Sequence, residues 1–253
     1  PQDVSLQLTI QALQMVNHVR SGSIAKMAFE AQFGRGQDFP PLKISTPAGD
    51  VYIEGKIDRV DLLDSSEGPK LKVIDYKSGS KAFDRKAAEA GLQLQLGIYL
   101  EAALAKGDAE PAGVFYYNIV NPQLRSGLDQ FVAEEISEEL WAKIREAYRM
   151  DGMFIKGAAV LDSIDSKRVR GVTSEIINYK LNKTNDNAAG SGVDAEEFEE
   201  FRAKFRLALE ESCERLISGE IEIAPRKGSG ACDYCDYKAI CAFDKAFPEN
   251  RHI

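Results

Sequence analysis

The chain has 253 residues, of which 44% are hydrophobic and 28% charged, proportions typical of a globular protein with one sizeable core. Its net charge of −8 argues against a strongly basic nucleic-acid binder, but local basic groups or a partner subunit could still hold DNA for a nuclease. No apolar run could cross a bilayer, and the amino end lacks both signal-peptide features and an initiator Met. We expect a cytoplasmic fragment or processed piece with no membrane contact.

Hydrophobic periodicity predicts the order of elements. Residues 3–33 are predicted to be helical, with a break near 21–23, because apolar side chains recur at three- and four-residue spacings (Leu6, Ile10, Leu13, Val16 and Val19). The sequence then alternates as strands do over 42–77. A helix is predicted over 87–106, despite two glycines, and a buried strand over 112–120. Two further helices are predicted over 135–150 and 194–218.

The most informative region is a predicted hairpin. Residues 55–61 (GKIDRVD) and 73–79 (VIDYKSG) form two strand-like runs, and the polar residues 64–69 between them indicate a turn. If the hairpin is symmetric and has no bulge, Asp58 lies opposite Asp75, and Lys56 lies opposite Lys77. The two carboxylates would then share one face of the hairpin.

Directly opposed strand residues lie close enough for like charges to repel, and a divalent cation would cancel that repulsion. Asp75 and Lys77 are two residues apart on one strand, so Lys77 would point to the same face as the proposed metal. A cation with an adjacent ammonium group suits phosphodiester hydrolysis, in which the metal activates water and the lysine orients it or offsets developing charge. The alternative is a solvated hairpin with scattered charges.

Three cysteines, Cys232, Cys235 and Cys241, have the spacing C-x2-C-x5-C. Such close spacing suits a zinc or iron–sulfur site, although free thiols or a disulfide remain alternatives. The fourth, Cys213, lies in a predicted amphipathic helix and fits a small core residue. We interpret the two histidines, His18 and His252, as surface residues rather than ligands.

Five segments occur in a specific order and spacing: 30–34 (EAQFG), 55–61, 74–78 (IDYKS), 95–100 (QLGIYL) and the cysteine array. In this pattern the chain resembles the carboxy-terminal nuclease domain of the AddB-type subunit of bacterial AddAB helicase–nucleases. That family is similar to the RecB-type branch of the PD-(D/E)XK nucleases. The resemblance implies an α/β fold with a restriction-endonuclease-like core, in which helices flank a mixed sheet.

The resemblance also implies roles for particular residues. Asp58, Asp75 and the main-chain carbonyl of Tyr76 would bind Mg²⁺, and Lys77 would serve the attacking water.

Gln95 and Tyr99 match the family's Gln-x3-Tyr helix and lie four residues apart, on one helical face. Without the family, they could be only a polar cap and a packing aromatic residue.

Two family features are missing. Members of this branch usually place a histidine on a helix before the first catalytic strand, but His18 lacks the surrounding motif, so we do not assign it that role. The family's [4Fe-4S] cluster takes one cysteine from upstream of the nuclease core and three from the array, here Cys232, Cys235 and Cys241. Cys213 follows the catalytic motifs, so the fourth ligand would lie outside this chain. We expect the cluster to be incomplete or absent here.

The resemblance implies a nuclease domain over residues 1–220 and a cysteine-rich segment over 221–253 that packs on it. The domain would hydrolyse a DNA strand unwound by a helicase–nuclease complex during double-strand break repair and recombination, with an AddA-type partner subunit providing the ATP-driven motor. Two other hypotheses are a catalytically silent DNA-binding or assembly module of the same fold, and a zinc-binding structural protein.

Overall fold

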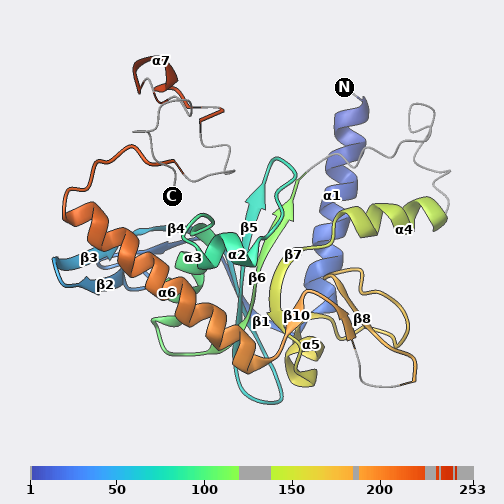
Figure 1. Ribbon diagram of the computed structural model, residues 1–253. Helices are drawn as coiled ribbons and strands as arrows, with labels where there is room; N and C mark the ends of the chain where they lie inside the picture. The colour runs from blue at the N-terminus through green and yellow to red at the C-terminus, as the bar shows by residue number, and fades with distance from the viewer. Residues whose placement is uncertain are drawn as a thin grey trace.

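A computed structural model describes residues 2–119, 138–184, 188–225, 232–233, 235–241 and 243. Its centre is a six-stranded mixed sheet (Figure 1) with the strand order β1-β4-β5-β6-β7-β10. These strands are β1 (Ile24–Phe33), β4 (Gly55–Leu63), β5 (Lys70–Lys77), β6 (Glu110–Asn118), β7 (Asp151–Ile155) and β10 (Gly192–Val193). The β4–β5 pair is the predicted antiparallel hairpin, whereas β5 and β6 are parallel. The mixed sheet confirms the expected fold class.

Helices cover both faces of the sheet (Figure 1). On one face, α3 (Gln95–Leu104) and α6 (Ala195–Ile217) pack over β4, β5 and β6 around a core that includes Leu96, Val114 and Phe205. On the other, α1 (Gln2–Ser21), α4 (Glu138–Ala147) and α5 (Ala158–Ile164) enclose a second core that includes Ile74 and Phe115. We call these the α3 face and the α1 face. None of the helices in the described ranges is long and apolar enough to span a membrane.

The remaining elements are short. A hairpin of β2 (Leu42–Thr46) and β3 (Gly49–Ile53) packs against α6, and β8 (Tyr179–Leu181) pairs with β9 (Ala188–Gly190). Helix α2 (Arg85–Glu89) precedes α3, and α7 (Lys238–Cys241) lies in the cysteine segment and buries no residue.

Two of the helix predictions need correction. Residues 24–33 form the edge strand β1 rather than a continuation of α1, because their backbone pairs with β4 along most of this length. The apolar residues of this run fit either period, and tertiary pairing decides between them. The predicted helix over 87–106 is divided into α2 and α3, since Gly91 adopts a φ of +75°, which ends the first helix.

The other predicted elements are confirmed where the structure describes them. Strand β6 is almost wholly buried, and α6 covers nearly all of the range predicted for the last helix. Helix α4 lies within the range predicted as 135–150, although residues 135–137 are outside the described part of the chain.

The interpretation of His18 as a surface residue is wrong. It faces the sheet from α1 and is 3% exposed, with its ring edge-on to Tyr117 at 5.2 Å between centroids. Burial, with added repulsion from Lys72 and Arg59, lowers the pKa of His18 to about 3. The apolar spacing of α1 could not reveal this, because His18 lies between apolar positions that are partly exposed. His252 is outside the described residues.

Helix α3 is held against α6 by a close approach and by charge. A Cβ atom added at Gly97 would lie 2.4 Å from ring atoms of Phe205, a buried residue of α6. Glu101, one turn further along α3, accepts hydrogen bonds from Arg202 and Arg206 of α6 at 2.7–2.8 Å for their Nε atoms. These contacts fix how α3 lies relative to α6.

We expect Gly97→Ala to lower the free energy of unfolding by about 1–2 kcal/mol, because the clash with Phe205 outweighs the better helix propensity of alanine. Urea unfolding followed by circular dichroism measures this. Gly79→Ala is the control, since no atom lies within 4 Å of its added Cβ. A more stable Gly97→Ala protein would contradict the close-approach argument.

The burial of His18 predicts a pH dependence of stability. Because the folded pKa of about 3 lies below the ordinary value of 6.5, the unfolded chain takes up the proton first as the pH falls. The part of the folding stability that depends on neutral His18 is fully present above pH 6.5 and is lost as the pH falls below it. This loss amounts to about 2 kcal/mol between pH 7 and pH 5. Denaturant unfolding of wild type and His18→Leu across this range should show this extra loss in the wild type alone. Parallel pH curves would show that His18 titrates normally.

Candidate active site

The β4–β5 hairpin has the register that its sequence predicts. Arg59 pairs with Ile74, Val60 with Val73, and Asp61 with Lys72. Asp58 precedes the first of these pairs, and its Oδ2 accepts a hydrogen bond of 2.9 Å from the main-chain N–H of Tyr76. A side chain of β4 thus continues the connection between the strands beyond their backbone ladder, and brings Asp58 next to Asp75.

Asp75 is a buried acidic residue. It is 1% exposed, and Lys77 Nζ lies 2.6 Å from its Oδ2. Burial raises the pKa of Asp75, the Lys77 ammonium opposes that shift, and the negative charge of Asp58 raises the pKa further. The repulsion between Asp58 and Asp75 inferred from the sequence is therefore present in the folded protein.

Lys77 is held from three sides. Besides its contact with Asp75, its Nζ donates a 2.6 Å hydrogen bond to Gln95 Oε1 and lies 5.4 Å from the ring centroid of Tyr116. Gln95 Nε2 in turn donates a 2.9 Å hydrogen bond to the hydroxyl of Tyr99. The side chains of β5 and α3 thus form one chain of polar contacts that fixes the ammonium group.

Gln95 and Tyr99 lie on one face of α3, as their four-residue spacing predicts. Gln95 does not act as a helix cap, since its amide bonds Lys77 and Tyr99 instead. Tyr99 combines its hydrogen bond with packing, because its ring meets Phe33 edge-on at 6.2 Å. The alternative of a packing aromatic residue describes part of what Tyr99 does.

Tyr116 is a site residue that the sequence analysis missed. It lies on β6 beside Asp75 and is 2% exposed. Burial, with the added charges of Asp75 and Tyr99, raises its pKa to about 12, so the phenol stays protonated at neutral pH. Residues 112–120 were predicted as a strand, but sequence alone does not give which residue of it pairs with Asp75.

Lys56 is placed differently from the prediction. No Lys56–Lys77 pair occurs in the described ladder, and Lys56 instead forms an ion pair with Glu30 of β1. Glu30 has a φ of +51°, uncommon for a residue other than glycine, and lies between the pairs that flank Asp58. Strands β1 and β4 are therefore irregular beside Asp58, and Lys56 lies beyond the β4–β5 ladder, which ends at Arg59.

The oxygen atoms at the site fit a divalent metal ion. Asp58 and Asp75 supply carboxylates, Tyr76 adds a main-chain carbonyl directly after Asp75, and hard cations prefer such oxygen ligands. The described residues contain no group of three or more His, Cys, Asp or Glu side chains that could hold a metal. A site here would therefore use two carboxylates and a main-chain oxygen, with no histidine from the described residues.

Comparison with known proteins gives the family. A profile of the PD-(D/E)XK nuclease superfamily matches residues 3–242. The chain belongs to this superfamily. Asp75-Tyr76-Lys77 has the form of the (D/E)XK half of the motif that names it, and Asp58 is the acidic residue on the preceding strand.

Individual relatives of this PD-(D/E)XK chain share one description. Proteins named as a subunit of an ATP-dependent helicase/deoxyribonuclease are 34% identical over 249 residues in Alkaliphilus metalliredigens, 32% over 256 in Clostridioides difficile and 36% over 247 in Thermoanaerobacter sp.. These alignments cover 93–97% of this chain but 21–22% of the relatives. The chain thus spans about a fifth of their length.

The cysteines of this nuclease chain separate into two kinds. Cys213 is buried in the α3-face core, as expected, and burial raises its pKa. Cys232, Cys235 and Cys241 are partly or fully exposed, and none of the four forms a disulfide. Within the described ranges these three cysteines are not gathered into a metal-binding group.

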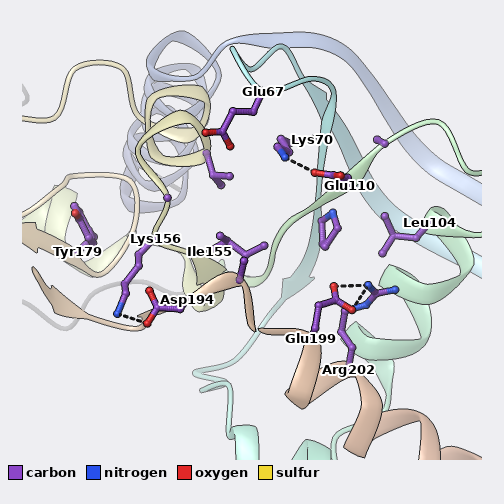
Figure 2. Close-up of a pocket in the computed structure, with 15 residues that line it drawn as sticks. Glu67, Lys70, Leu104, Glu110, Ile155, Lys156, Tyr179, Asp194, Glu199 and Arg202 are labelled. Carbon is purple, nitrogen blue, oxygen red and sulfur yellow. Dashed lines mark hydrogen bonds and ion pairs between the residues drawn. The ribbon is translucent and has the colours of Figure 1, made fainter. Parts of the chain in front are cut away.

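A large cavity among the described residues lies away from the nuclease motif. It has a volume of about 940 Å³ and is lined by residues from the start of β5 and β6, the end of β7 and the start of α6. Figure 2 shows three ion pairs among its charged side chains: Lys70 with Glu110, Lys156 with Asp194, and Arg202 with Glu199. Lys70 begins β5 and Asp75 lies five residues further along it, about 17 Å away at ordinary strand rise, so this cavity does not hold the candidate site.

Proposed function

We propose that this chain is a Mg²⁺-dependent deoxyribonuclease domain that hydrolyses phosphodiester bonds in DNA. The observation that supports this most is the convergence of Asp58 and Asp75 beside Lys77, in a chain of the PD-(D/E)XK superfamily. Two adjacent carboxylates with a single fixed ammonium group form a site for a divalent cation next to a positively charged group.

In the proposed mechanism, Asp58, Asp75 and the Tyr76 carbonyl hold the metal. Mg²⁺, when bound, would polarise the phosphate and lower the pKa of a water molecule. Lys77 Nζ, fixed by Asp75 and Gln95, orients the attacking water and offsets charge that develops on the phosphate oxygens. Gln95 and Tyr99 position Lys77, because the Tyr99 hydroxyl sets the direction of the Gln95 amide.

The relatives' name supports a place in a larger assembly. Since proteins named as helicase/deoxyribonuclease subunits match this chain over a fifth of their length, the chain would be the nuclease part of such a subunit. It would cut a strand unwound by a helicase–nuclease complex in double-strand break repair and recombination. An AddA-type subunit would be the partner and would provide the ATP-driven motor.

The cysteine-rich segment, residues 221–253, would pack on the nuclease domain of residues 1–220 through a [4Fe-4S] cluster. Cys232, Cys235 and Cys241 would supply three thiolates, and a ligand outside this chain the fourth. Such a cluster would crosslink the segment to the core, as metal ligation stabilises other small folds, with no part in the hydrolysis.

A second candidate is a catalytically weak or silent DNA-binding or assembly module. One observation favours it, namely that His18 is on the α1 face, packed on Tyr117, so it cannot serve as the metal-site histidine typical of this branch. Intact Asp58, Asp75 and Lys77 favour the nuclease.

We expect Lys77→Ala to abolish Mg²⁺-dependent cleavage of single-stranded DNA while largely preserving Mg²⁺ binding, because the ligands remain. Asp75→Ala should weaken both. Cleavage of a fluorescent oligonucleotide and isothermal titration calorimetry with Mg²⁺ measure the two properties.

Lys81→Ala is a matched control, since Lys81 is an exposed lysine that bonds Asn118 through its main-chain atoms, which the substitution keeps. Equal cleavage by wild type and Lys77→Ala would refute the proposed site. Mg²⁺ binding without cleavage by the wild type would favour the silent module.

Metal analysis of the anaerobically purified chain tests the cysteine segment. We expect iron and sulfide well below four per chain, because only three cysteines of the array are available, and we expect Cys232→Ser to remove what is bound. One zinc per chain that Cys232→Ser abolishes would instead support the zinc-binding structural hypothesis.

A further inference from the structure

A group of buried charges lies behind the candidate active site, on the α1 face of the sheet. Arg59 and Asp61 of β4 and Lys72 of β5 form it, and all three are at most 3% exposed. We call them the Arg59 cluster. None of the three takes part in the proposed hydrolysis, so their retention in a buried position needs another explanation, because buried charges are costly unless each is matched.

Arg59 makes the stronger of the two ion pairs. Its guanidinium binds Asp61 through two hydrogen bonds, Nε to Oδ1 at 2.7 Å and Nη2 to Oδ2 at 2.8 Å. Lys72 Nζ is 3.3 Å from Asp61 Oδ2, without the second contact. The paired geometry of Arg59 and Asp61 holds the guanidinium plane in one orientation.

From that orientation Arg59 reaches the strand that carries the metal ligands. Its Nη1 donates a 3.4 Å hydrogen bond to the hydroxyl of Tyr76, while Phe29 covers the guanidinium at 5.6 Å. The Tyr76 ring also meets Tyr117 in a T-shaped contact at 5.7 Å between centroids. The Tyr76 side chain is thus anchored on the α1 face, away from Asp75 and Lys77.

The main chain of Tyr76 serves the candidate site. Its N–H binds Asp58, and its carbonyl is the third ligand in the proposed metal site. The peptide groups of a strand point in the plane of the sheet toward neighbouring strands, so anchoring the Tyr76 ring on the α1 face restricts the Cα atom from which both main-chain groups extend.

We propose that Arg59 is a positioning residue for the metal site, acting through Tyr76 to set the main-chain atoms that hold Asp58 and face the metal. This inference rests on the proposed function. Lys72 lies in the same cluster but pairs with Asp61 rather than with Tyr76, which makes it a matched comparison.

The test compares Arg59→Met with Lys72→Met. Each substitution removes one of the two basic partners of Asp61: Arg59→Met removes two hydrogen bonds, and Lys72→Met removes the single 3.3 Å contact. We expect Arg59→Met to weaken Mg²⁺ binding, measured by calorimetry, by about 10- to 100-fold. Losses of this size are typical when a residue that supports a metal ligand is removed from a metal site. Lys72→Met should bind Mg²⁺ as the wild type does.

Tyr76→Phe separates the proposed path from general destabilisation. It removes only the hydroxyl that Arg59 contacts. We expect it to raise the Mg²⁺ dissociation constant, but by less than Arg59→Met does. The Arg59→Met/Tyr76→Phe double variant should bind no more weakly than Arg59→Met, because both changes interrupt one path. Circular dichroism checks that each variant is folded.

Several outcomes would overturn the inference: unchanged Mg²⁺ affinity in Arg59→Met, equal weakening in Lys72→Met, or additive effects in the double variant. If Arg59→Met does not fold, Tyr76→Phe decides, and wild-type Mg²⁺ affinity in it refutes the inference. Absence of Mg²⁺ binding and cleavage in the wild type would refute the proposed function as well. Wild-type binding with unaffected variants refutes the positioning role alone.

Discussion

The hydrogen bond from the Tyr76 N–H to Asp58 Oδ2 is the contact on which the candidate site depends. The backbone ladder of β4 and β5 begins at Arg59, so Asp58 would otherwise be free to turn away from Asp75. The bond uses a donor that the ladder leaves available and holds two mutually repelling carboxylates together. That arrangement is stable only with a compensating charge, which Lys77 supplies in part.

Strand β5 uses its two faces for different purposes. Asp75 and Lys77 face α3 and the candidate site, whereas Lys72 and Tyr76 face the α1 side, where the buried charges lie. A single extended segment therefore carries both the reactive groups and their anchor. Few rotatable bonds separate the Tyr76 ring from Asp75 and Lys77. The positions of these two side chains therefore depend closely on how the Tyr76 ring packs on the other face.

Local patterns predicted the hairpin register and the Gln95–Tyr99 pair, because turn symmetry and helical spacing depend on neighbouring residues. Long-range packing was less accessible. Edge pairing made 24–33 a strand, burial against Tyr117 changed the environment of His18, and the β5–β6 register placed Tyr116 beside Asp75. Each of these depends on residues distant in sequence. The metal-binding roles and the cysteine ligation remain predictions.

The contact between Gly97 and Phe205 has a mechanical consequence. Helix α6 has 23 residues and is about 35 Å long, and after its last turn the chain continues toward the cysteines. Near its middle it contacts α3 through Phe205, Arg202 and Arg206. Helix α6 is therefore a rigid connection between the cysteine segment and α3. A displacement of its carboxyl end along the helix axis would move α3 and shift Gln95 relative to Lys77.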